Sequence, residues 1–164
     1  MGLLDDLRKQ SEEIKEHEAV ELARREQAEL VYREQIMPKM IALYRHLNEL
    51  TQHLNVINLD VTVPYGFSPE GQTIDLKQHD YITHIDSTNE TKLVTFAFRC
   101  SNPKDFEFVA VGKQAIDKYT HFLKKYNLQY QLQESRNANG QINGARFTVK
   151  ASIPVRFAFK ADVD

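Results

Sequence analysis

Seven apolar residues between positions 36 and 57 recur at alternating spacings of four and three: Ile36, Met40, Leu43, Leu47, Leu50, Leu54 and Ile57. An α-helix with this spacing carries one narrow apolar stripe, here called the seam, which has to be covered by a partner. Two interpretations stay open. The seam could form a coiled coil with another chain, although three heptads are at the lower limit for predicting one. It could also pack on the protein's own sheet, because Met37, Ile41 and Tyr44 would widen the stripe.

Residues 1–37, upstream of most of the seam, are dense in charged side chains. From Leu4 to Gln35 the chain has no glycine or proline and is rich in Glu, Arg, Lys, Ala and Leu, which favour helix. Pairs such as Glu21 with Arg25 add about a few tenths of a kcal/mol each. Apolar residues are too sparse for a core helix. We therefore predict a solvated helical arm that lies along a partner or projects.

Pro38 separates this arm from the rest of the seam. Proline lacks a backbone N–H and clashes with the carbonyl four residues earlier, that of Glu34. A new helix could begin with Pro38 as its first residue, but residues 35–37 include no N-capping side chain. We expect one long helix kinked near Pro38, with a clean break as the alternative.

Composition limits the class of protein. At 164 residues, with 41% hydrophobic and 27% charged residues, the chain is long enough for one soluble domain with an appendage. No segment is apolar enough to span a membrane, and the first residues do not resemble a signal peptide. Cys100 is the single cysteine and cannot form an intramolecular disulfide. We expect a cytoplasmic protein.

After the seam the apolar pattern changes to a period of two, which is typical of strands. Residues 57–63 alternate, residues 64–72 resemble a loop, and residues 73–86 and 92–100 form further strands around a polar turn. A fourth strand runs over residues 106–111. Because the connections are short, we predict an antiparallel meander over residues 56–111.

The remaining third combines a helix and strands. Residues 112–126 carry an apolar face at helical spacing, and residues 129–163 hold strands around a loop with two Asn-Gly pairs, of which Asn139-Gly140 is the preferred hairpin tip. From Phe147 to Ala161 apolar residues alternate without a slip across Pro154. This unbroken phase predicts one long strand, bent or at a sheet edge near the proline.

The polar face of that strand is basic and is the first candidate binding site. Residues 1–54, 55–109 and 110–164 carry net charges of −3, −4 and +5. Such a distribution is typical of an anion-binding face or of two parts that attract each other. No aromatic residue interleaves with the cations on this face, so nucleic acid is not favoured, and a solvated face or a dock for the acidic arm is the main interpretation. The candidate residues are Arg146, Lys150, Arg156 and Lys160.

Other candidate sites are weaker. Asp80, His84 and Asp86 alternate on one strand and could bind a divalent metal, but no second ligand cluster has matching spacing. Cys100 follows Phe96 and Phe98 on the same side of a strand and is expected to be a small buried residue. No motif of a hydrolase, a zinc enzyme or a dinucleotide-binding fold occurs, and we predict neither a cofactor nor a catalytic residue.

Together these patterns predict an α+β fold: a long kinked N-terminal helix, then an antiparallel sheet of about six strands with one inserted helix packed on it. Residues 1–37 would form the arm, and residues 38–164 the domain, with helices at 38–55 and 112–126. The expected function is a non-catalytic assembly or adaptor protein that self-associates, or binds a protein partner, through its N-terminal helix. A module that binds an anionic ligand or nucleic acid is the alternative, and a hydrolase or transferase using Asp80, His84, Asp86 or Cys100 is a weaker one.

Overall fold

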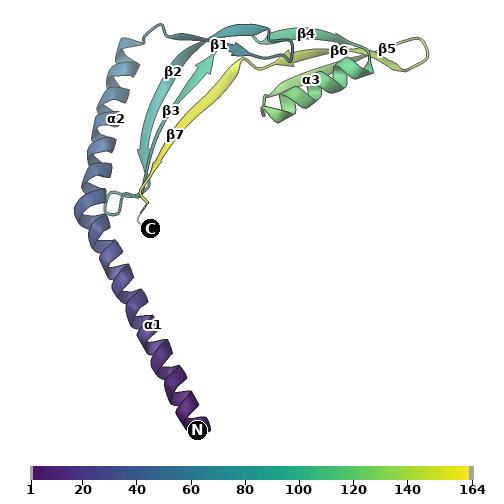
Figure 1. Ribbon diagram of the computed structural model, residues 1–164. Coiled ribbons are helices and arrows are strands. Elements are labelled where there is room, and N and C mark those ends of the chain that lie inside the picture. Colours follow the sequence, from purple (N-terminus) through teal and green to yellow (C-terminus); the bar gives the residue numbers. More distant parts are fainter. Residues whose placement is uncertain (1, 163–164) are drawn as a thin grey trace. The chain divides into compact units, whose positions relative to one another are not determined.

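The computed structural model describes residues 2–162 and has an α+β fold with a long N-terminal helix and seven strands (Figure 1). The predicted fold class is confirmed, with seven strands in two sheets in place of about six in one. The helical elements are α1 (Leu3–Val31), the π-helical turn η1 (Tyr32–Ile36), α2 (Met37–Ile57) and α3 (Lys113–Lys125). The strands are β1 (Thr62–Gly66), β2 (Thr73–Ile85), β3 (Leu93–Ser101), β4 (Phe106–Val111), β5 (Tyr130–Arg136), β6 (Ile142–Val149) and β7 (Ser152–Lys160).

The N-terminal helix runs without a break from α1 through η1 into α2. Residues 32–36 widen into one π-helical turn, and the Met37 N–H donates to the Tyr32 carbonyl five residues earlier. Since a proline ring collides with the carbonyl four residues before it in an α-helix, this wider turn accommodates Pro38. The predicted kinked helix is confirmed, and its irregular turn precedes the proline.

The first sheet has the strand order β1-β2-β3-β7. β1 pairs antiparallel with the first part of β2, from Thr62 opposite Lys77 to Gly66 opposite Thr73. The predicted first strand, residues 57–63, is wrong in its limits, because the helix continues to Ile57 and Asn58 then turns with a positive φ of 48°. Asn is one of the few residues that adopt this left-handed conformation readily. The alternating residues that suggested a strand lie largely at the end of α2 and in the turn that follows it.

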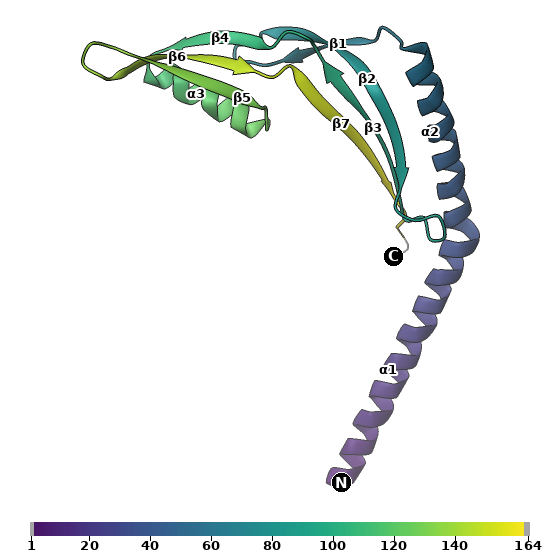
Figure 2. The same ribbon diagram turned by 180° about the vertical axis from the view of Figure 1, so that it is seen from behind.

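The second sheet has the order β4-β6-β5 and is antiparallel. The β5–β6 hairpin turns at the predicted Asn139-Gly140 tip, where Gly140 has a φ of 76° that glycine adopts without strain. Figure 1 and Figure 2 both show α3 lying across one face of this sheet. The predicted helix at 112–126 is thus confirmed, and Gly112, with a φ of 83°, forms the corner from β4 into it. The meander is confirmed only for β1 to β3, since β4 joins the second sheet.

The predicted single strand over residues 147–161 is wrong: β6 and β7 belong to different sheets and are separated by Lys150 and Ala151. Three hydrogen bonds to other segments of the chain fix the conformation of Lys150 and Ala151 between the two strands. The Lys150 N–H donates to Gln129 O, the Ala151 N–H donates to an Asp105 carboxylate oxygen, and Ala151 O accepts from the Asn102 N–H. The alternation of apolar residues continues across the break because Ala151 is buried like Phe147 and Val149.

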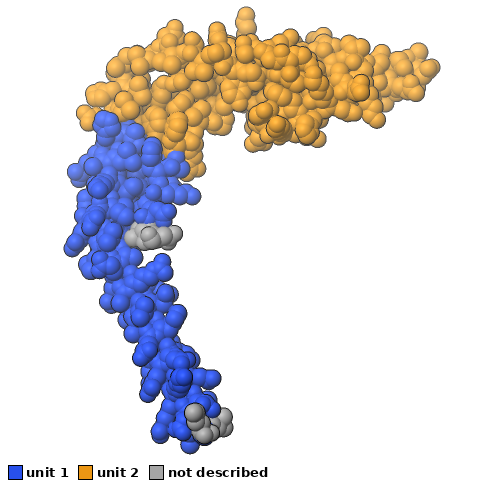
Figure 3. Space-filling view, in the orientation of Figure 1, with its two compact units in different colours: residues 1–48, 83–95, 158–164 blue, residues 49–82, 96–157 orange. Residues whose placement is uncertain are grey.

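The chain divides into two compact units, which Figure 3 colours separately. One unit comprises residues 1–48, 83–95 and 158–164, and the other comprises residues 49–82 and 96–157. The second unit contains the main core, and complete burial of each large apolar side chain there contributes about 1.5–3 kcal/mol. Its fully buried large residues are Phe67, Leu76, Leu123, Phe147 and Val149.

Candidate functional site

Helix α1 is exposed over most of its length. Between residues 4 and 30, only Glu21 and Ala28 are as much as half-buried, and the large apolar side chains are open to solvent. Leu4, Val20 and Ile14 are 72%, 66% and 59% exposed. The helix carries nine acidic and five basic side chains, a net charge of −4. It therefore presents an acidic surface with apolar residues among the charges.

The exposed part of the helix ends at Tyr32, whose side chain is 2% exposed. The Lys92 ammonium lies 5.5 Å from the centre of the Tyr32 ring, a cation–π contact with the β2–β3 turn. Burial raises the pKa of Tyr32, and the nearby Glu90, Asp86 and Glu29 carboxylates raise it further. The contact with residue 92 shows that the part of the helix around the π turn packs on the protein itself.

The seam residues differ in burial along α2. Met40 is buried, whereas Ile36, Leu43, Leu47 and Leu54 are half-buried. Leu50 and Ile57, near the end of the helix, are 38% and 61% exposed.

Hydrogen bonds tie α2 to strand β2 at two places. The Thr83 hydroxyl donates to Leu47 O over 3.2 Å. The Asn55 side chain donates to Tyr81 O and accepts from the Tyr81 N–H, so its amide pairs with β2 as a neighbouring strand would. These bonds show that part of the surface of α2 packs within its own chain.

The structure separates the four residues of the predicted basic stripe. Arg146 lies on β6, Lys150 in the connection, and Arg156 and Lys160 on β7. All four are exposed, but they do not share one strand. Arg146 faces the open side of the second sheet, opposite Val109 of β4 and Gln133 of β5.

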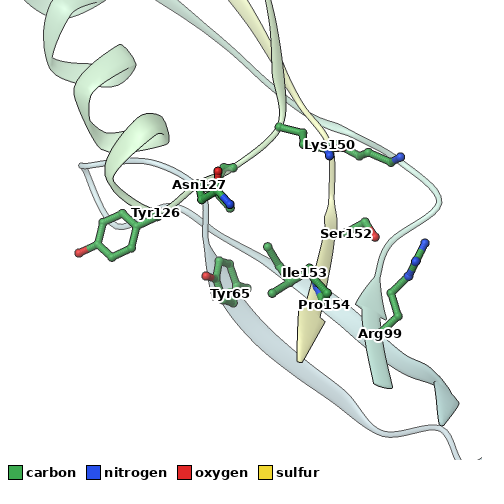
Figure 4. Close-up of a pocket in the computed structure, with 10 residues that line it drawn as sticks. Tyr65, Arg99, Tyr126, Asn127, Lys150, Ser152, Ile153 and Pro154 are labelled. Carbon is green, nitrogen blue, oxygen red and sulfur yellow. The ribbon is translucent and has the colours of Figure 1, made fainter. Parts of the chain in front are cut away.

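Lys150 lines a cavity of about 540 Å³ at the start of β7 (Figure 4). Arg99 of β3 lines the same cavity, and in Figure 4 the Arg99 and Lys150 side chains lie on the side of β7 that carries Ser152, whereas Tyr65 and Ile153 lie on the other. Over the described residues the lining holds two cations and no carboxylate. Two cations, a hydroxyl and open access are features of a site for a small anion.

Two of the three candidate metal ligands, Asp80 and Asp86, are engaged in other contacts, and His84 is exposed. The Asp80 carboxylate is 2.9 Å from His79 Nδ1. One Asp86 carboxylate oxygen accepts N–H bonds from Ser87, Lys92 and Leu93, which form the β2–β3 turn. Within residues 2–162, no three His, Cys, Asp or Glu side chains gather closely enough to hold a metal ion.

His79 makes a second contact that the sequence analysis did not identify. Its Nε2 atom lies 2.6 Å from the Ser101 hydroxyl, so the histidine stands between Asp80 and a serine. If the residues of β2 and β3 are paired one by one, starting from the polar turn that joins the two strands, His79 falls near the end of β3. The sequence does not reveal the backbone irregularity at Asp80, which has a positive φ of 55°.

Cys100 is buried as predicted, and burial raises the pKa of its thiol. A buried thiol with a raised pKa is a poor nucleophile. Over the part of the chain that the structure describes, no helix combines the length and the hydropathy that a membrane crossing requires.

Comparison of the chain with protein-family models, with curated proteins and with solved structures finds no match.

Proposed function

We propose that the protein is a cytoplasmic assembly module whose N-terminal helix α1 binds a second copy of the chain. The observation that carries this proposal is the exposure of α1, in which large apolar side chains such as Leu4 and Val20 lie open to solvent. A helix of this length needs packing or many charge pairs to be stable in water. A partner along α1 would supply that packing.

Charge favours one arrangement of the two copies. The net charge of −4 on α1 disfavours pairing of two arms, because like charges repel across a helix interface. Residues 110–164 carry a net charge of +5. We therefore propose that the arm of one copy binds the basic last third of another, around the exposed Arg146 and Arg156. Such a head-to-tail contact closes into a ring or continues as a chain of molecules.

A truncated protein that lacks most of α1 tests the proposed contact. Removal of residues 1–27 deletes most of the exposed helix but keeps the buried Tyr32. We expect light scattering to give a mass above one chain for the full-length protein and the mass of one chain for the truncated form, with unchanged thermal unfolding. Raising the salt concentration should dissociate the full-length protein, because the contact is between opposite charges.

Two results would contradict the proposal. The full-length protein could have the mass of one chain at every concentration. Alternatively, the truncated form could keep the full-length assembly state, which would place the interface elsewhere. As a matched control, a peptide of residues 1–27 should bind the truncated protein, and a peptide with the same composition in scrambled order should bind less.

The second candidate function is binding of a small anion in the cavity that Arg99 and Lys150 line. We expect titration calorimetry at low salt to detect binding of inorganic pyrophosphate, and Arg99→Gln to weaken it about tenfold or more, which corresponds to about 1.4 kcal/mol. Arg146→Gln removes the same charge from the open face of the second sheet and is the control. If both variants weaken binding equally, the anion responds to overall surface charge and the cavity has no special role.

A further inference from the structure

The side chain of His79 has a polar partner at each ring nitrogen. Its Nδ1 atom lies 2.9 Å from Asp80 Oδ2, and its Nε2 atom lies 2.6 Å from Ser101 Oγ. A carboxylate at Nδ1 keeps the ring proton on that atom, so Nε2 is left as the acceptor for the serine O–H. The order carboxylate, imidazole and hydroxyl is the one that activates a serine as a nucleophile.

Local structure explains how the three side chains meet. β2 and β3 are neighbours in the sheet, His79 lies within β2, and Ser101 is the last residue of β3. Asp80 follows His79 directly and has a φ of 55°. Aspartate, like asparagine, adopts this left-handed conformation more readily than most residues, and non-glycine residues that adopt it cluster at functional sites. Here the turn of the backbone accompanies an aspartate side chain that reaches back to the ring of its neighbour.

All three residues are at least partly exposed. The His79 side chain is 32% exposed, the Asp80 side chain is 72% exposed, and Ser101 is half-buried. His79 and Asp80, but not Ser101, line a hollow of about 420 Å³, together with residues at and just after the end of α2 such as Leu54 and Asn58. This hollow offers room for one part of a small ester beside the histidine, while the ester carbonyl reaches Ser101 at the Nε2 side of the ring.

From this geometry we propose that Ser101, His79 and Asp80 form a site that hydrolyses small carboxylic esters, with Ser101 as the nucleophile. Side chains two residues apart share a face of a strand, so Arg99 lies on the same face of β3 as Ser101. Its positive charge favours an ester that carries a negative charge and stabilises the oxyanion that develops during attack. This inference is independent of association through α1.

The reaction needs no cofactor. The Ser101 oxygen bonds to the carbonyl carbon of the ester while the hydroxyl proton passes to His79 Nε2. The bond from that carbon to the alkoxy oxygen then breaks, and the alcohol leaves with the proton from His79. Water, deprotonated by His79, attacks the carbonyl carbon of the acyl-serine. The bond from that carbon to the Ser101 oxygen then breaks, the proton passes from His79 back to the Ser101 oxygen, and the carboxylic acid is released. The Asp80 carboxylate lies beside Nδ1 and balances the charge of the imidazolium in both steps.

The test uses the full-length protein and two probes. A fluorophosphonate should form one covalent adduct, located at Ser101 by peptide mass spectrometry, and Ser101→Ala should abolish it. Ser135→Ala is the matched control, since Ser135 is an exposed serine whose hydroxyl bonds to Asn143. It should leave labelling unchanged. Absence of an adduct on the wild-type protein, or an adduct that persists in Ser101→Ala, would overturn the proposal.

Steady-state hydrolysis separates catalysis from a structural role. We expect the wild type to hydrolyse 4-nitrophenyl hemisuccinate faster than 4-nitrophenyl acetate, and His79→Gln, which can still bond to Ser101, to lower kcat by about 10²–10⁴-fold. Asp80→Asn should lower kcat with little change in KM. If His79→Gln shifts only the unfolding midpoint and leaves turnover unchanged, the three residues are a structural hydrogen-bond network and the proposal fails.

Discussion

Tyr119 illustrates at the residue scale how burial and one hydrogen bond act together. Its ring stacks on Phe108 with centroids 4.3 Å apart, and its hydroxyl bonds to the Glu70 carboxylate. Burial raises the pKa of Tyr119, and the hydrogen bond to Glu70 raises it further, to about 12. The same hydrogen bond, followed by that of Lys118, lowers the pKa of Glu70. The folded state therefore favours a neutral tyrosine beside an ionised glutamate.

The first prediction concerns alkaline pH. Folding raises the pKa of Tyr119 from the ordinary value of 10.0 to about 12. Such a group contributes stability that is fully present below pH 10 and is lost as the pH rises through 12. We expect Tyr119→Phe to flatten the fall in unfolding free energy over that interval, because phenylalanine cannot ionise. Urea unfolding at several pH values, with phenolate absorbance as the second probe, checks this. Equal slopes for the two proteins would contradict it.

At the element scale, the β2–β3 turn depends on one aspartate. Burial alone would raise the pKa of Asp86, but the backbone N–H bonds from Leu93, Lys92 and Ser87 outweigh it and lower the pKa. The Ser87 hydroxyl accepts two further N–H bonds, from Asn89 and Glu90. The turn is thus held by side-chain acceptors at its first residues.

The second prediction follows from this turn. Asp86→Ala should lower the free energy of unfolding by about 1–2 kcal/mol, since several backbone N–H groups lose their acceptor. In the wild type this contribution to stability is fully present at pH values above 3.8, the ordinary pKa of the carboxyl group. It is lost as the pH falls through the lowered pKa that Asp86 has in the folded protein. Asn89→Ala is the control, because Asn89 joins the network through its backbone N–H. Equal urea midpoints for the two variants at neutral pH would show that Asp86 does not hold the turn.

Elements set by local pattern could be predicted from the sequence, and those set by distant contacts could not. The kinked helix, α3 and the hairpin at Asn139-Gly140 follow from periodicity, glycine and proline. The break at Lys150 depends on Gln129, Asp105 and Asn102, which contact it only after folding.

The candidate sites could likewise be predicted only in the part that local sequence determines. Lys150 was identified as a cation, but its cavity partner Arg99 comes from another strand, and the pairing of His79 with Ser101 needs the register of β2 and β3.

At the scale of the whole molecule, Cys100 reports on opening of the core. It lies in the buried cluster with Phe67, Leu76 and Phe147, and burial raises the pKa of its thiol. Only the thiolate reacts with a disulfide reagent, so the native protein should react slowly and labelling should follow opening of this core. For a typical domain stability, labelling should be slower than that of the unfolded chain by at least about a thousandfold.

The third prediction uses two valines that differ in burial. Val149 is completely buried on β6, whereas Val111, on the neighbouring β4, is 78% exposed. Val149→Ala should destabilise the core by about 2 kcal/mol and speed Cys100 labelling about 30-fold, because each 1.4 kcal/mol changes an opening equilibrium tenfold. Val111→Ala makes the same chemical change and should leave the rate within about twofold. If both variants label at the wild-type rate while urea shows Val149→Ala to be less stable, Cys100 is reached by a local opening that does not involve the core around β6.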